Sequence, residues 1–263
     1  MKLTANGISM RYELDGPAGA PVVTLSNSLA TDLSMWDPQV PALAARFRVL
    51  RYDTRGHGGT GAPPGGYTLD LLAEDVRALL RALGIARTHF VGLSMGGMIG
   101  QTLALQTPEL LLSLALCDTS SRIPPEAKPL WDERIRTAET RGMEPLVEPT
   151  LARWLTPATR AARADLGEAV ASMIRRTDPT GYAGCCHAIA ALDLTDRLEA
   201  IRLPTLVLVG EDDPGTPVAA SRAIHERIKG SELLIIRAAA HLSNLERPAE
   251  FTQALTGFLA TVG

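Results

Sequence analysis

The segment Gly92-Leu93-Ser94-Met95-Gly96-Gly97 contains a G-x-S-x-G pattern, and this pattern decides the fold that the sequence predicts. Residues 89–92 form a predicted strand, and residues 96–106 form a predicted helix rich in small residues. A serine in such a strand-to-helix turn has a strained backbone, which only small flanking residues tolerate. Its hydroxyl lies at the helix N-terminus, where free N–H groups favour developing negative charge. The pattern therefore predicts that Ser94 is a nucleophile.

Strands and helices alternate on both sides of this segment. Apolar or alternating runs predict strands at residues 8–14, 22–25, 48–52, 112–116, 204–210 and 231–237, and amphipathic runs predict helices at residues 36–47, 68–83 and 248–259. Such alternation is typical of a parallel sheet covered by helices on both faces. Residues 121–200 contain no convincing strand and have a helical character. We expect an α/β core, residues 1–120 and 201–263, with a helical cap insertion, residues 121–200.

The composition limits the classes of function. The chain has 263 residues, 46% of them hydrophobic, and a net charge of −3. The sequence has no basic cluster of the kind that predicts nucleic-acid binding, and none of its apolar runs approaches the roughly 20 residues of a membrane span. The N-terminus lacks the apolar region of a signal peptide. The three cysteines are Cys117, Cys185 and Cys186; their odd number and the adjacency of the last two argue against a disulfide framework, so we expect a cytoplasmic protein. The sequence does not define an oligomeric state.

Ser94 needs a general base, because an isolated serine hydroxyl is a weak nucleophile. His241 follows the last predicted strand, on a loop. Serine hydrolases with a strand–serine–helix turn have the chain order serine, acid, histidine, and His241 satisfies it. We therefore predict that His241 is the base.

The acid that orients the histidine should follow a strand between Ser94 and His241. Glu211, Asp212 and Asp213 come directly after the predicted strand 204–210, and Asp118 follows the preceding strand. The acid holds the imidazole tautomer and stabilises the imidazolium. The position alone leaves Asp213, Asp212 and Asp118 as candidates.

Acyl transfer also requires hydrogen-bond donors for the oxyanion. We expect one donor to be the backbone N–H of Met95, directly after the nucleophile. The second should come from the loop after the early strand 22–25, and we predict the N–H of Leu29.

Five segments together resemble the 3-oxoadipate enol-lactonases, bacterial enzymes of aromatic catabolism. They are Leu25-Ser26-Asn27-Ser28-Leu29 with Met35-Trp36-Asp37, Tyr52-Asp53-Thr54-Arg55-Gly56-His57-Gly58, the serine turn, Gly210-Glu211-Asp212-Asp213, and His241-Leu242-Ser243-Asn244-Leu245-Glu246. The resemblance covers almost the whole chain. It implies the α/β-hydrolase fold, with a mostly parallel eight-stranded sheet and a helical cap. It also implies that Asp213 is the acid, because the family has its acid three residues after the glycine.

The resemblance implies hydrolysis of 3-oxoadipate enol-lactone to 3-oxoadipate in the β-ketoadipate pathway, through an acyl-enzyme and without a metal or organic cofactor. This small-molecule lactone carries a carboxylate, so a guanidinium is expected in the pocket. Arg134 is the candidate, because the cap should cover Ser94. Trp131 and Trp154 are candidate pocket walls, and Ser28 is a further candidate contact.

Other functions fit the same residues. A general carboxylesterase, a cofactor-free perhydrolase and a carbon–carbon bond hydrolase would use the same three side chains. A small polar pocket with a carboxylate anchor would favour the lactonase, and a deep apolar pocket would favour an esterase. A ligand receptor built on this fold is a non-enzymatic alternative, which rapid multiple turnover would exclude.

Overall fold

The computed structural model describes residues 1–262, and its centre is one eight-stranded sheet. The strand order is β1-β2-β4-β3-β5-β6-β7-β8. Strand β2 pairs antiparallel with both β1 and β4, and the strands from β4 to β8 in this order are parallel to one another. The strands are β1 (Lys2–Ala5), β2 (Ile8–Asp15), β3 (Val22–Ser26), β4 (Arg48–Tyr52), β5 (Thr88–Leu93), β6 (Leu111–Cys117), β7 (Thr205–Gly210) and β8 (Glu232–Ile236). The predicted mostly parallel sheet is therefore confirmed.

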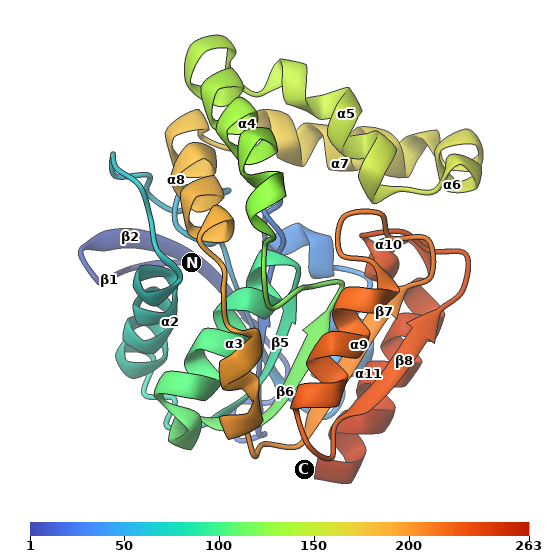
Figure 1. Cartoon of the computed structure of the whole chain (residues 1–263). Helices are drawn as coiled ribbons and strands as arrows, with labels where there is room; N and C mark the ends of the chain where they lie inside the picture. The colour runs from blue at the N-terminus through green and yellow to red at the C-terminus, as the bar shows by residue number, and fades with distance from the viewer. Residues whose placement is uncertain (263) are drawn as a thin grey trace.

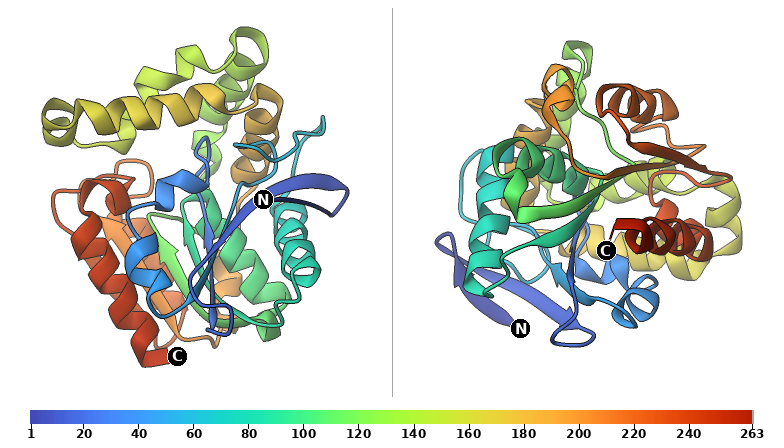
Figure 2. Two further views of the ribbon diagram at one scale, coloured as in Figure 1. Left: turned by 180° about the vertical axis from the view of Figure 1, so that it is seen from behind. Right: turned by 90° about the horizontal axis from the view of Figure 1, so that it is seen from below.

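The central strands are apolar because both of their faces are covered. All six residues of β5 and all six of β7 are buried, whereas β8, at the edge, alternates between exposed and half-buried positions. Helices α2 (Leu69–Ala82), α3 (Met95–Gln106) and α9 (Val218–Arg227) cover one face. Helices α1 (Val40–Ala44) and α11 (Pro248–Val262) cover the other, as the view from behind in Figure 2 shows. Short elements η1 (Leu33–Trp36), η2 (Pro108–Leu110), η4 (Thr195–Ala200) and α10 (Ser243–Glu246) complete the sheet layers.

Most of the predicted elements occur within a residue or two of their expected ends. The helix expected over residues 36–47 is wrong in length: only η1 and the single-turn α1 form there. Pro38 and Pro41 explain the difference, because proline removes a backbone donor and restricts the residue before it. Strand β1 was not predicted.

The chain between β6 and β7 forms a group of helices above the sheet (Figure 1). After η3 (Pro125–Ala127) come α4 (Lys128–Arg141), α5 (Glu144–Trp154), α6 (Pro157–Ala162), α7 (Ala164–Arg176) and α8 (Pro179–Ala190). These helices lie over the ends of the strands from which the loops carrying Ser94, Asp213 and His241 emerge. Among residues 1–262, no helix has the length and apolar character needed to cross a bilayer.

Helix α8 packs directly against loops of the sheet layer. Gly56 and Gly181 meet backbone to backbone, and a β-carbon on either residue would collide with the other. The N–H of Tyr67 donates to the carbonyl of Gly184 at 3.1 Å. Glycine is required at this contact because no side chain fits between the two backbones.

Candidate active site

Ser94 occupies the tight turn between β5 and α3. Its φ of +56° lies in the left-handed region, which non-glycine residues adopt at a cost in energy. Gly92 and Gly96 are needed on either side, because a β-carbon on Gly92 would collide with the backbone of Gly96 and one on Gly96 with the backbone of Ser26. The Ser94 N–H donates to the carbonyl of Cys117 at 2.8 Å, and the Thr119 hydroxyl donates to the Ser94 carbonyl at 2.7 Å. Neighbouring strands therefore hold the strained turn.

Asp213 and His241 come together from the loops after β7 and β8. His241 Nδ1 lies 2.8 Å from Asp213 Oδ2. Asp213 also accepts hydrogen bonds from the N–H groups of Gly215 (2.8 Å) and Thr216 (3.1 Å), and from the Thr216 hydroxyl (2.5 Å). Because the carboxylate has four donors, its orientation toward the imidazole is fixed. This geometry assigns the proton of the imidazole to Nδ1 and leaves Nε2 as an acceptor.

The electrostatics of this pair favour an ionised carboxylate. Burial alone would raise the pKa of Asp213, but the charge of His241 and hydrogen bonds from His241 and Thr216 lower it below its ordinary value. An ionised Asp213 stabilises a positive charge on His241, which a general base acquires during the reaction.

The two rival acids lie elsewhere. Asp118 is fully buried, accepts the Gly210 N–H at 2.8 Å and is 2.5 Å from the Ser243 hydroxyl, with no hydrogen bond to His241. Burial, reinforced by the negative charge of Asp213, raises the pKa of Asp118 well above its ordinary value. Asp212 is exposed, and its N–H donates to the Ala239 carbonyl. Of the three candidates, only Asp213 contacts the imidazole.

Ser94 and His241 line the same cavity, of about 430 Å³, between the sheet edge and the helical insertion. In the part of the chain that the structure describes, the side-chain hydrogen bonds of His241 are those of Nδ1 with Asp213 and Thr216, and none joins it to the Ser94 hydroxyl. Contacts of this kind are often long before substrate binds and shorten in the reactive complex. The two side chains therefore face the same cavity, in which a bound substrate would lie between them.

The two expected oxyanion donors lie beside Ser94. Met95 is the first residue of α3, and Leu29 lines the cavity. Within residues 1–262, neither backbone N–H donates to another backbone carbonyl. Both donors are therefore available to a ligand. Ser28 is fully buried and does not line the cavity; its carbonyl accepts hydrogen bonds from Thr31.

The helical insertion contributes the opposite wall. Trp131, Arg134 and Trp154 all line the cavity, as does Arg153, which the sequence analysis did not identify. The guanidinium of Arg134 lies 4.5 Å above the ring of Trp131, and Arg153 donates to the Thr150 hydroxyl at 3.2 Å. Neither arginine forms an ion pair with any described residue, 1–262. Burial, together with the charge of nearby Arg134, lowers the pKa of Arg153 to about 10.

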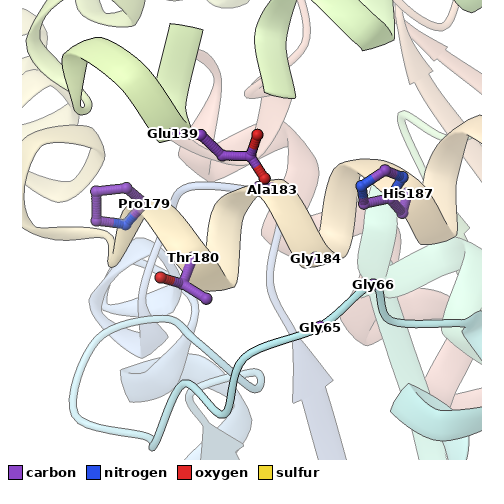
Figure 3. A pocket seen from close by; sticks show the side chains of 8 residues that line it. All are labelled: Gly65, Gly66, Glu139, Pro179, Thr180, Ala183, Gly184 and His187. Atoms are coloured by element: carbon purple, nitrogen blue, oxygen red, sulfur yellow. The ribbon is translucent and has the colours of Figure 1, made fainter. Parts of the chain in front are cut away.

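A second hollow, of about 290 Å³, lies outside this site, between α8 and the loop at Gly65 and Gly66 (Figure 3). His187 points into it, whereas Cys185 and Cys186 are buried. Both cysteines are free thiols in the hydrophobic core, where they pack as small apolar residues. Burial raises the pKa of Cys185 well above its ordinary value, which keeps the thiol protonated and unreactive.

Thr216 and Glu246 lie beside the site and were not predicted, although Thr216 had a signal in the sequence. Thr216 ends the run Asp213-Pro214-Gly215-Thr216, which is typical of a turn in which the aspartate accepts downstream N–H groups. Glu246 is five residues after His241, and it is buried against the histidine loop. Arg153 had no such signal, because its position depends on how α5 packs.

The sheet topology and the serine turn define an α/β hydrolase. The α/β-hydrolase fold family matches residues 21–248, and the chain belongs to that family. It is 37% identical to 3-oxoadipate enol-lactonase 2 of Acinetobacter baylyi over 96% of this chain and 94% of that protein. It is 35% identical to a putative carbamate hydrolase, RutD, of Rhizobium rhizogenes over 94% of this chain and 95% of the relative.

Solved structures agree with these sequence relatives. The crystal structure of the enol-lactonase from Burkholderia xenovorans superposes with a TM-score of 0.95 at 41% identity, covering 99% of this chain and 100% of the other. The chain is thus similar to the 3-oxoadipate enol-lactonases in sequence and in structure. The protein is an ester-hydrolysing enzyme.

Proposed function

We propose that the enzyme hydrolyses 3-oxoadipate enol-lactone to 3-oxoadipate, in the β-ketoadipate pathway. The observation that carries this proposal is that two arginines without carboxylate partners, Arg134 and Arg153, line the same cavity as Ser94 and His241. These guanidinium groups meet the expectation of a carboxylate anchor, whereas the rest of the lining, with Leu29, Met98 and Trp131, is largely apolar, as expected of a carboxylesterase. An apolar cavity with two unpaired guanidinium groups suits a small substrate that has one anionic end.

In this proposal Ser94 is the nucleophile, His241 the general base and Asp213 the orienting acid. Ser94 Oγ attacks the lactone carbonyl carbon while His241 Nε2 takes the hydroxyl proton. The tetrahedral oxyanion accepts hydrogen bonds from the N–H groups of Leu29 and Met95. Asp213 keeps the Nδ1 proton in place and stabilises the imidazolium.

Collapse of the tetrahedral intermediate breaks the ring C–O bond. The leaving group is an enolate, which is a weaker base than an ordinary alkoxide and leaves more readily. The proton that His241 Nε2 took from Ser94 passes to the enolate, which gives the ketone, still attached to Ser94 through an ester, and restores the neutral imidazole. Water then attacks this ester with His241 as the base and releases 3-oxoadipate. No cofactor or metal takes part in the scheme.

We propose that residues 121–200 form a cap domain on the core of residues 1–120 and 201–263. Arg134 on α4 and Arg153 on α5 would bind the substrate carboxylate, and Trp131 and Trp154 would flank the ring. A carboxylate between the two guanidinium groups would relieve their mutual repulsion, which contributes to the lowered pKa of Arg153.

The test follows the loss of the enol-lactone absorbance with wild type and with Ser94→Ala. We expect rapid turnover by the wild type and a loss of about three orders of magnitude or more in kcat for the variant, because removal of the nucleophile abolishes covalent catalysis. Ser9→Ala is the matched control, since Ser9 is exposed on β2 and far from the cavity.

Two results would contradict the proposal. A wild type that is inactive on the lactone but rapid on simple neutral esters would make the protein a general carboxylesterase. Full activity of Ser94→Ala on the lactone would exclude a mechanism through an acyl-enzyme on Ser94.

A further inference from the structure

Glu246 is a buried carboxylate that the proposed reaction does not use. It ends α10 and is only 7% exposed. No arginine, lysine or histidine among residues 1–262 forms an ion pair with it. A buried carboxylate without a cation requires strong hydrogen-bond donors, because burial removes its hydration.

The donors to Glu246 come from both the core and the cap. Oε2 accepts the N–H of Ala240, the residue before His241, at 2.6 Å. Oε1 accepts the N–H of Thr156 at 2.9 Å and the hydroxyl of Thr156 at 2.8 Å. Thr156 lies between α5 and α6, 90 residues earlier in the chain. One side chain therefore connects the histidine loop to the helical insertion.

Two further contacts join the same segments. The N–H of Leu242 donates to the carbonyl of Trp154 at 3.2 Å. The indole ring of Trp154 packs on the His241 ring, with centroids 5.7 Å apart and planes inclined by 31°. The residues on both sides of His241 are thus held by the cap segment Trp154-Leu155-Thr156, and one cap side chain covers the imidazole.

Apolar packing around this contact is incomplete. A hollow of about 440 Å³ lies beside it, between residues 155–158 and the core loops at Asp212 and Ala240. The hydrogen bonds of Glu246 therefore cross the boundary between the two segments beside an open hollow.

We propose that Glu246 is a positioning residue that couples the cap to the general base. By holding Thr156 and Ala240 at fixed positions, it keeps Trp154 against His241 and keeps the imidazole in the cavity that Ser94 also lines. This inference rests on the proposed role of His241. It predicts that loss of Glu246 slows the chemical step in each folded active site and does not merely reduce the amount of folded enzyme.

The experiment measures hydrolysis of 4-nitrophenyl acetate, with active sites counted by stoichiometric titration with a phosphonate that labels Ser94. Glu246→Gln retains the size of the side chain, but its amide nitrogen cannot accept one of the present donors. We expect kcat per titrated site to fall about tenfold, the rate equivalent of one hydrogen bond to a charged group, with KM changed less than about threefold. Glu250→Gln removes the same charge from an exposed position on α11 and should leave kcat per site unchanged.

Variants of Thr156 test the cap side of the contact. Thr156→Val removes the hydroxyl and should lower kcat per site about threefold, whereas Thr156→Ser retains the hydroxyl and should restore it. If Glu246→Gln does not fold, the difference between these two variants decides the matter.

A kcat per titrated site within about twofold of wild type, in Glu246→Gln or between the Thr156 variants, would overturn the coupling whatever happens to stability. Failure of the proposed function would look different. In that case the wild-type enzyme would not turn over the enol-lactone, or Ser94→Ala would retain full activity, whatever the effect of Glu246→Gln on the ester.

Discussion

The core wall and the cap wall of the cavity hold their polar side chains in different ways. On the core side, Asp213 has four hydrogen-bond donors and orients His241 from a buried position. On the cap side, Arg134 rests on the ring of Trp131 and Arg153 has a hydroxyl partner, with no carboxylate on either. A fully hydrogen-bonded carboxylate suits a fixed reaction, whereas unpaired guanidinium groups are free to bind what enters the cavity. We therefore propose that the loops at the strand ends carry out the reaction and that residues 121–200 select the substrate.

The largest expected effect distinguishes the two buried aspartates of the core. Asp213→Asn should lower kcat by about 10⁴-fold, because an amide does not stabilise the imidazolium and favours the wrong tautomer. Asp118→Asn should lower kcat by less than about tenfold, since Asp118 contacts Gly210 and Ser243 but not His241. Steady-state kinetics on the enol-lactone measure both. The reverse order of effects would identify Asp118, in the loop after β6, as the acid that orients His241.

A smaller effect tests the cap wall. Arg134→Gln and Arg153→Gln should each raise KM for the anionic lactone about 10- to 100-fold, the equivalent of one charge-assisted hydrogen bond, because the carboxylate loses a cationic partner. Hydrolysis of a neutral ester such as 4-nitrophenyl acetate should change little. Arg136→Gln is the control, since Arg136 is an exposed residue on the same helix as Arg134, paired with Glu133. Equal losses on both substrates would mean that the arginines support the cap and do not select the substrate.

The smallest effect concerns stability. The pKa of Asp118 is raised in the folded state, so its contribution to stability is fully present below its ordinary pKa and is lost as the pH rises through the raised value. Asp118→Asn has a neutral side chain at every pH. The variant should therefore be more stable relative to wild type at pH 8 than at pH 4: its free energy of unfolding minus that of wild type should be larger at pH 8.

Urea denaturation at the two pH values measures this difference. Asp212→Asn is the control, because Asp212 is exposed and should show no such trend. A difference of the opposite sign would mean that Asp118 is ionised and stabilising in the folded protein.

The same division between core and cap explains what the sequence could predict. Ser94 and His241 follow strands of a parallel sheet, and the ends of such strands converge, so residues far apart in the chain could be expected at one edge. Arg55, in the loop after β4, forms a buried bidentate ion pair with Asp75 on α2 and so belongs to the core framework. The acid could be narrowed only to the carboxylates after two strands, because its identity depends on the turn that Thr216 completes.

The cap side was less predictable. Arg134 and Trp131 were expected near the cavity, but Arg153 was not, because the inward face of α5 depends on its packing against α4 and α7. Amphipathic periodicity does not specify such packing when a helix contains internal prolines, as α5 does at Pro149. The contact of Glu246 could not be predicted, because its partner Thr156 lies 90 positions away and no local sequence pattern joins the two residues.

The close approach of Gly56 and Gly181 has a consequence for protein engineering. Exchanging the insertion of this enzyme with that of a relative is an obvious route to new substrates. A chimera that introduces any side chain at either glycine would push the transplanted helices away from the loops of the core. Both halves of a successful graft must therefore bring their own glycine to the junction.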